Sequence, residues 1–207
     1  MSFRVVVLVS GSGTNLQAIL DTLHGQGGIE VTGVASSREG VAALERAERA
    51  GVASAVFAAA DHGSREARDG ALARWIEERG ADLVVLAGFM ELLGPAFVRR
   101  FERRIVNVHP SLLPAFPGIR AIEQAVEHGV RVTGVTVHYV DEGVDTGPVI
   151  LQEPLALPYP ADIALVESRI HEIEHRLLPQ AIRLIAAGAV RPDPASDRRV
   201  IVDGSVS

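Results

Sequence analysis

An asparagine and a histidine two residues apart are the side chains of this sequence best suited to chemistry. Asn107 and His109 lie in the segment NVHPSLLP, which starts at residue 107. Residues two apart on a β-strand point the same way, so an amide and an imidazole would face one pocket. Both can donate hydrogen bonds to a carbonyl oxygen that gains negative charge, as an oxyanion hole requires. Spacing alone leaves an ordinary structural histidine equally open.

An acidic turn, DEGVDTGP, follows at residues 141–148. A carboxylate close to an imidazole raises the pKa of the imidazole and fixes its orientation. Taken alone, however, a turn of this composition is typical of a solvent-exposed hairpin loop. Pairing of this turn with a histidine is therefore a hypothesis.

A glycine-rich loop, SGSGTN, occupies residues 10–15 directly after an apolar segment. Glycines at the start of a helix let backbone N–H groups approach an anion. The dinucleotide fingerprint is incomplete because Leu16 stands at its third glycine, and no lysine follows as in a P-loop. A single phosphate, such as that of a phosphoribosyl group, fits this loop better than a pyrophosphate. A tight strand-to-helix turn without a ligand is the alternative.

Two histidines frame the sequence HEIEH at residues 171–175, a pattern by which one helix face can bind zinc. A catalytic zinc needs a third protein ligand, and residues 176–207 contain neither histidine nor glutamate. We therefore expect no metal site and keep a zinc hydrolase as an alternative class. A nucleotide-binding oxidoreductase is another, although ASSRE at 35–39 lacks the acidic ribose ligand in its expected place.

The composition excludes further classes. The chain has 207 residues and no cysteine, which rules out disulfide scaffolds, thiolate metal sites and a cysteine nucleophile. Its 20 Lys and Arg against 26 Asp and Glu give a charge of −6, without the basic surface of a nucleic-acid binder. The N-terminal apolar run, residues 5–9, is too short for a signal peptide or a membrane span. We expect a cytoplasmic protein with neither nucleic-acid nor membrane partners.

Strands and helices alternate along the chain, which predicts a parallel sheet built from right-handed crossovers. We expect a single α/β domain over 1–207: Rossmann-like, with a mainly parallel twisted sheet, helices on both faces, a C-terminal antiparallel strand pair and a long helix. Its phosphate-binding half would span about 1–100, its catalytic half about 101–190, and a polar tail 191–207. The expected strands are 3–9, 29–36, 53–58, 82–88, 104–110, 131–140 and 149–155, with a short hairpin or strand at 198–203. The expected helices are 14–23, 40–50, 64–79, a short one from Pro95, 119–128 and 161–187, while 110–118 forms a rigid loop.

The segments that carry chemistry resemble, in this order, those of the formyltransferases that use 10-formyltetrahydrofolate. The resemblance runs from about residue 4 to 187 and implies two small-molecule substrates, the formyl folate and glycinamide ribonucleotide of purine (IMP) synthesis. Another folate-dependent formyltransferase or a formyltetrahydrofolate hydrolase is the alternative. The resemblance rests on SGSGTN at 10–15, VVLAGFM at 84–90, NVHPSLLP at 107–114 and HYVDEGVDTGPVI at 138–150.

The resemblance also implies roles for individual residues. The catalytic trio would be Asn107, His109 and Asp145: the amide and a protonated His109 stabilise the oxyanion, and Asp145 keeps His109 charged. Glu91 stands where relatives commonly carry a basic residue, so we expect the backbone, rather than this side chain, to contact the formyl folate, which is the donor of the formyl group. No metal is implied, and a monomer and a homodimer both stay open. The acceptor would be held by Gly13, Thr14, Asn15 and Glu174. The formyl folate would contact Arg65, Met90, Glu91, Leu92, Leu93, Asn107, Val140, Asp141, Glu142, Gly143, Val144 and Asp145.

Overall fold

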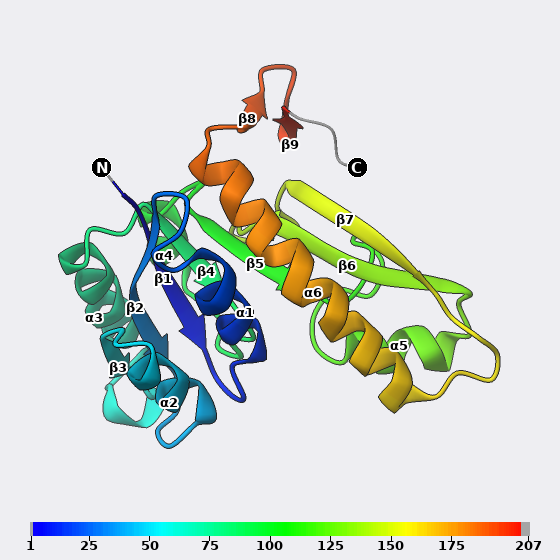
Figure 1. Ribbon diagram of the computed structural model, residues 1–207, viewed down its shortest axis with the longest axis horizontal. Coiled ribbons are helices and arrows are strands. Elements are labelled where there is room, and N and C mark those ends of the chain that lie inside the picture. Colours follow the sequence, from blue (N-terminus) through cyan, green and yellow to red (C-terminus); the bar gives the residue numbers. More distant parts are fainter. Residues whose placement is uncertain (1, 204–207) are drawn as a thin grey trace. The chain divides into compact units, whose positions relative to one another are not determined.

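The computed structural model describes residues 2–203 (Figure 1). Within them the chain forms two compact units, of which the first ends at Asn107 and the second begins at Val108. The boundary falls inside the strand β5 (Ile105–His109). Among the described residues, the main sheet has seven strands in the order β3-β2-β1-β4-β5-β6-β7.

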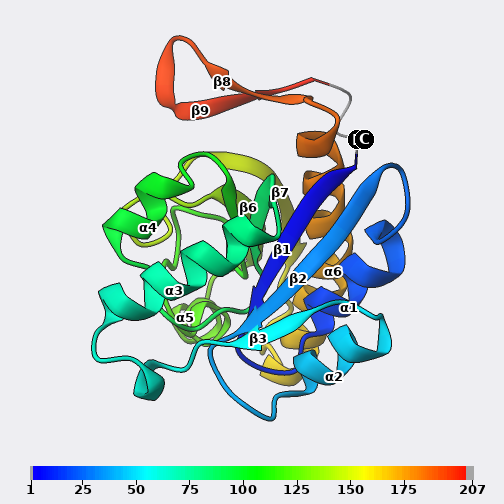
Figure 2. The same ribbon diagram turned by 90° about the vertical axis from the view of Figure 1, so that its left-hand side faces the viewer.

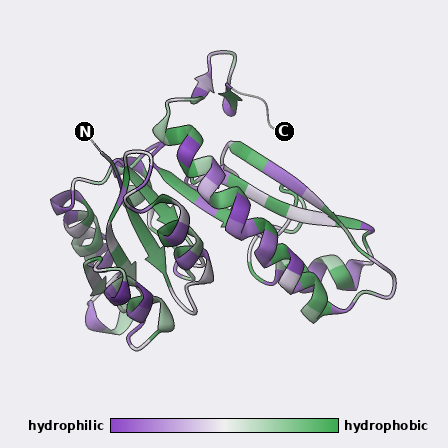
Figure 3. Cartoon of the chain, viewed as in Figure 1, coloured by the Kyte–Doolittle hydropathy of each residue, from purple (hydrophilic) through white to green (hydrophobic). Residues whose placement is uncertain are grey.

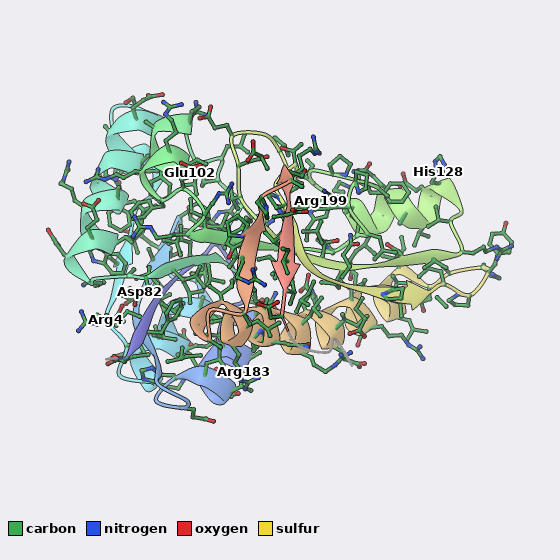
Figure 4. All side chains as sticks on the ribbon, turned by 90° about the horizontal axis from the view of Figure 1, so that it is seen from above. Arg4, Asp82, Glu102, His128, Arg183 and Arg199 are labelled. Atoms are coloured by element: carbon green, nitrogen blue, oxygen red, sulfur yellow. The ribbon has the colours of Figure 1, made fainter. Side chains whose placement is uncertain are left out.

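The strands of the first unit pair in parallel and are buried on both faces. Residues Val5 to Val9 are all 0% exposed, because a strand covered on both sides must be apolar at every position. The carboxylate of Asp82 accepts a hydrogen bond from the Arg4 N–H at 2.8 Å, at the start of the central strand (Figure 4). The strands are β1 (Phe3–Val9), β2 (Ile29–Ser36), β3 (Ser54–Val56) and β4 (Leu83–Leu86), followed by β5.

Helices cover both faces of this parallel sheet (Figure 2). Two of them, α1 (Thr14–Leu23) and α2 (Ala42–Arg49), pack against β2 and each other. On the other face lies α3 (Arg65–Glu78), which contacts α4 (Pro95–Arg100) and the short 3-10 helix η1 (Ala59–Asp61). The carboxyl ends of the strands therefore open into the loops that precede these helices, where ligands bind in α/β sheets.

The second unit is built on an antiparallel pair, β6 (Val132–Tyr139) with β7 (Val149–Ala156). A long helix, α6 (Ile163–Ala186), packs on both strands and on α5 (Ala121–His128). Apolar and polar residues alternate along α6 because one side of the helix is buried (Figure 3). The chain then forms a hairpin of β8 (Val190–Asp193) and β9 (Ser196–Val202), which contacts β7.

The expected α/β fold class is confirmed, including the antiparallel pair and the long helix, and residues 110–118 form no helix or strand. The third strand is shorter than expected because β3 is a half-exposed edge strand and residues after it turn into η1. A hairpin does occupy the expected tail position, starting earlier than 198. Residues 204–207 of that tail lie outside the described residues, and the single-domain organisation stays a prediction. Across residues 2–203, every helix is too short or too polar to cross a membrane.

Candidate active site

His109 is the last residue of β5 and is almost fully buried, with 4% exposure. Nε2 lies 2.8 Å from the carbonyl oxygen of Phe116, in the loop that follows the strand. Because a carbonyl oxygen can only accept, Nε2 carries the hydrogen of this bond. The other ring nitrogen, Nδ1, is 3.4 Å from Oδ2 of Asp145. The acidic turn and the histidine, which the sequence linked only as a hypothesis, therefore meet in the second unit.

Asp145 is held in an uncommon backbone conformation that aims its carboxylate inward. Its φ is +53°, in the left-handed region that side chains rarely adopt and that occurs at functional sites. Oδ2 accepts a hydrogen bond of 2.7 Å from the Gly118 N–H, so the carboxylate also ties the loop after β5 to the turn. Within the turn, Oδ1 of Asp141 accepts from Gly143 N–H and from the Thr146 hydroxyl, which fixes its shape.

A second buried histidine completes the cluster. His138 on β6 is 2% exposed, and its Nε2 lies 3.6 Å from Oδ1 of Asp145. Its Nδ1–H donates to the Tyr139 carbonyl oxygen at 2.8 Å. Asp145 therefore lies between two imidazoles. The sequence alone left open whether His138 lies near the site or is an ordinary hydrogen-bonded histidine; its place at the end of the strand that leads into the acidic turn was the available signal.

Burial and the neighbouring groups act in opposite directions on the pKa values of His109 and Asp145. Burial lowers the pKa of His109 below its ordinary value and outweighs the opposing effects of the Phe116 carbonyl and the Asp145 carboxylate. A charged ring is poorly solvated at such a buried position, while the nearby carboxylate of Asp145 favours the charged form. For Asp145 itself, burial is outweighed by the hydrogen bonds from His138 and Gly118 and by the imidazole charges, and its pKa is lowered.

Asn107 lies two residues before His109 on β5 and is half-buried. Both side chains therefore leave the strand on the same side. Val108, between them, is 7% exposed. This arrangement brings an amide and an imidazole to the carboxyl end of one parallel strand.

The glycine loop lies between β1 and α1 and is braced by α2. Gly13 caps α1 with a φ of +71°, and no side-chain hydrogen bond closes this end of the helix. The Ala43 N–H donates to the Gly11 carbonyl oxygen at 3.2 Å, and Nε of Arg46 donates to the Ser12 carbonyl oxygen at 2.9 Å. Residues of α2 thus hold the loop by hydrogen bonds to its carbonyl oxygens. The N-terminus of α1 keeps the positive end of its dipole, which favours an anion.

We expect Gly13→Ala to destabilise the protein by about 2 kcal/mol, the usual size of an overpacked contact with added backbone strain. A Cβ at Gly13 would lie 2.6 Å from Cβ and 2.8 Å from Cα of Ala43, and the positive φ disfavours alanine. Gly11→Ala is the matched control, because a Cβ there meets nothing within 4 Å. Urea unfolding of both variants measures the difference. Equal stability would contradict this account of the loop.

The segment after β4 is attached to the start of the glycine loop. The Ser10 hydroxyl accepts a 2.9 Å hydrogen bond from the Met90 N–H and lies 2.6 Å from the Ser37 hydroxyl. Met90 and Leu92 expose 65% and 64% of their surface. Arg65, the first residue of α3, is about half exposed, and its side chain approaches Gly94. Arg65 and the segment Met90 to Leu93, all expected to contact the formyl folate, therefore lie in the first unit.

The remaining expected residues lie elsewhere in the second unit. Glu174 is on α6 and is 6% exposed. The turn that contains Val140, Asp141, Glu142, Gly143 and Val144 connects β6 to β7. A cavity of about 350 Å³ opens beside this turn. It is lined by Leu113, Pro114, Pro117, Val144, Asp145, Thr146, Gly147, Val149, Arg198, Arg199 and Val200.

The HEIEH histidines stack on α6 with ring centroids 6.2 Å apart. No third His, Asp or Glu joins them in a group that could hold a metal ion, as far as residues 2–203 are concerned. The helical placement expected for this motif is thus present without the additional ligand that a zinc site requires.

The chain is thus an α/β protein in which a buried histidine at the carboxyl end of a strand faces an aspartate, at the edge of the sheet where ligands bind in this fold class. Residues 3–182 of the chain match the model of the protein family described as "Formyl transferase". The chain therefore belongs to the formyl transferase family.

Several relatives are similar over most of the chain. A phosphoribosylglycinamide formyltransferase of Mycobacterium tuberculosis strain H37Rv is 44% identical, covering 90% of this chain and 86% of the relative. The trifunctional purine biosynthetic protein adenosine-3 of Homo sapiens is 42% identical over 91% of this chain, which spans only 19% of the human protein. A crystal structure of glycinamide ribonucleotide transformylase 1 from Symbiobacterium toebii superposes with a TM-score of 0.92 at 47% identity, covering 97% and 94% of the two chains.

Proposed function

We propose that the protein transfers the formyl group of 10-formyltetrahydrofolate to the amine of N1-(5-phospho-D-ribosyl)glycinamide, a step of purine (IMP) synthesis. The observation that carries the proposal is the buried pair formed by His109, at the end of β5, and Asp145, in the turn after β6. Asn107 lies two residues before His109 on the same strand. Family membership and the M. tuberculosis relative, named for this activity, support the choice of reaction.

In the proposed reaction, the acceptor amine attacks the formyl carbon, and the formyl oxygen becomes an oxyanion. The Asn107 amide and the Nε2–H of His109 donate to that oxygen. Nε2–H now donates to the Phe116 carbonyl, so the formyl oxygen would take the place of this acceptor. Because Nε2 keeps its hydrogen in both protonation states, a lowered pKa of His109 leaves the donor in place.

Asp145 acts on Nδ1 of the same ring. The nearby carboxylate favours a second proton, taken up from water, on Nδ1, and this proton gives the ring the positive charge that stabilises the oxyanion. The bond between the formyl carbon and N10 then breaks, and the proton lost by the acceptor amine moves to N10 through His109 or water. The products are the formamide and tetrahydrofolate. Direct transfer needs no covalent enzyme intermediate, because both reactants are held together.

The two substrates would be held by different parts of the chain. For the acceptor we assign the phosphate and ribose to Gly13, Thr14 and Asn15, whose helix end favours an anion, and the glycinamide part to Glu174. The formyl folate would contact Arg65, the segment Met90 to Leu93, Asn107 and the turn Val140 to Asp145. The exposed side chains of Met90 and Leu92 support an apolar contact with its ring system.

A spectrophotometric assay with both substrates tests the reaction. We expect deformylated folate to appear only when glycinamide ribonucleotide is present, with initial rates that fit a sequential mechanism. Donor consumption at the same rate without acceptor would identify a hydrolase, and transfer to another amine would change the acceptor. A ping-pong pattern would contradict direct transfer, since it requires a formyl-enzyme intermediate.

A further inference from the structure

Arg68 on α3 is a buried cation whose partners lie in the segment after β4. Its side chain is 3% exposed, although arginine is almost never buried without a charged partner. Nη1 donates to Oε2 of Glu91 at 2.8 Å, and Nη2 donates to the Leu92 carbonyl oxygen at 2.9 Å. Nε and Nη2 both donate to Oδ1 of Asp69, at 3.0 and 2.8 Å. One guanidinium therefore fastens two consecutive residues of the segment to α3.

The neighbouring carboxylate extends this attachment. Oδ2 of Asp69 accepts a hydrogen bond of 2.7 Å from the Gly94 N–H, so the segment is tied at residues 91, 92 and 94. Asp69 is itself 6% exposed at its side chain. Bonds of this kind, charged and buried, are among the stronger ones in proteins, and losing one partner leaves an uncompensated charge. The backbone of this segment is consequently fixed in advance of binding.

The pairing also decides what the segment presents. Glu91 directs its carboxylate to Arg68 and keeps only 32% of its side chain exposed, while Met90 and Leu92 on either side are about two-thirds exposed. A free carboxylate here would repel the anionic glutamate tail of a folate. Because Arg68 compensates the charge of this carboxylate, the segment presents backbone groups and apolar side chains to a ligand.

We propose that the Arg68–Glu91 ion pair determines how the formyl folate is recognised. It holds the segment 90–93 for main-chain and apolar contact, and it compensates the charge of Glu91 that would otherwise repel the anionic tail of the folate. The inference rests on the proposed function. Arg68 and Asp69 position the segment 90–93. Glu91 affects the preference for tail length only when its charge is not compensated by Arg68. The protein should therefore bind folates of short and long glutamate tails with similar affinity.

Binding and kinetics of four proteins test this inference: wild type, Glu91→Gln, Arg68→Met and the double variant. Calorimetry gives the Kd for monoglutamyl and polyglutamyl tetrahydrofolate, and the assay gives KM and kcat with the matching formyl donors. We expect wild-type Kd values for the two tails to agree within about threefold, the size of a weak exposed charge effect. Glu91→Gln should likewise keep the Kd values for the two tails within about threefold of each other, because its amide oxygen still accepts from Arg68 and no charge is left unpaired.

Arg68→Met should raise Kd and KM about tenfold for the monoglutamyl folate, the effect of losing one charged hydrogen-bond partner, and change kcat less. The rise should be larger for the polyglutamyl folate, because Glu91 is then unpaired. In the double variant this extra tail penalty should disappear while the general weakening stays. A merely structural role of Arg68 would not create a penalty that depends on tail length.

Glu77→Gln is the matched control, because it breaks an exposed ion pair between α3 and Arg100 in the same unit. It should change neither Kd. Equal weakening for both tails in Arg68→Met, or a selective gain for long tails in Glu91→Gln, would overturn the inference. If Arg68→Met does not fold, Arg68→Lys should give the same pattern in smaller size, because lysine cannot bridge all three acceptors. Folate binding with this pattern but without formyl transfer would refute the proposed function alone.

Discussion

We expect His109→Ala to lower kcat for formyl transfer by about 100-fold or more, the usual cost of losing one oxyanion donor. The substitution removes the Nε2–H that would donate to the formyl oxygen and the Nδ1 that faces Asp145. The KM values for both substrates should change much less, because the bond to the oxyanion is made mainly in the transition state. Steady-state kinetics with both substrates varied measures the effect.

Two further variants separate chemistry from loss of structure. His109→Gln places an amide N–H near the position of Nε2, and we expect it to recover part of the rate lost in His109→Ala. His62→Asn, at a partly exposed histidine that stacks on Phe57, should leave kcat unchanged. Circular dichroism must show that each variant is folded. A near-normal rate in folded His109→Ala would refute the assigned role.

We expect Asn107→Ala to cause a loss of similar size, since it removes the second proposed donor to the same oxygen. The double variant with His109→Ala should lose less than the product of the single effects, because residues that act on one atom are not additive. Additive losses would indicate that the two side chains act on different steps.

Much of the fold could be predicted because its strands carry a local signal. The run from Val5 to Val9 is apolar at every position and rich in β-branched residues, which is typical of a strand buried on both faces. That Asn107 and His109 lie on the same side of a strand was also predictable, because side chains alternate between the two sides of a strand from one residue to the next. The half-exposed edge strand β3 has a weaker pattern, and its ends were misplaced.

The rest of the site depends on residues that are distant in sequence. His138 meets Asp145 through a left-handed turn, and no pattern in the sequence indicates that its ring nitrogen reaches the carboxylate. The pairing of Arg68 with Glu91 joins residues 23 positions apart, which a motif cannot show. The lowered pKa of His109 likewise follows from burial, whereas the sequence suggested only the opposing effect of a carboxylate.

Asp145→Asn is expected to lower kcat by about 100-fold or more, in the range found when a carboxylate that orients a catalytic imidazole is neutralised. The amide can still accept from the Gly118 N–H, so the turn should keep its shape. What is lost is the negative charge between His109 and His138, with its oxygens 3.4 and 3.6 Å from the two rings. Steady-state kinetics at several pH values measures the effect.

The pKa of His109 gives a direct test of that mechanism. Burial lowers this pKa, and Asp145 opposes the effect, so removing the carboxylate should lower the pKa further. Titration of the imidazole nitrogens by NMR in wild type and Asp145→Asn measures the change. Asp203→Asn, which breaks an exposed ion pair with Arg191, is the control and should alter neither kcat nor the His109 pKa. If Asp145→Asn lost activity while the His109 pKa stayed constant or rose, Asp145 would act by orientation rather than by charge.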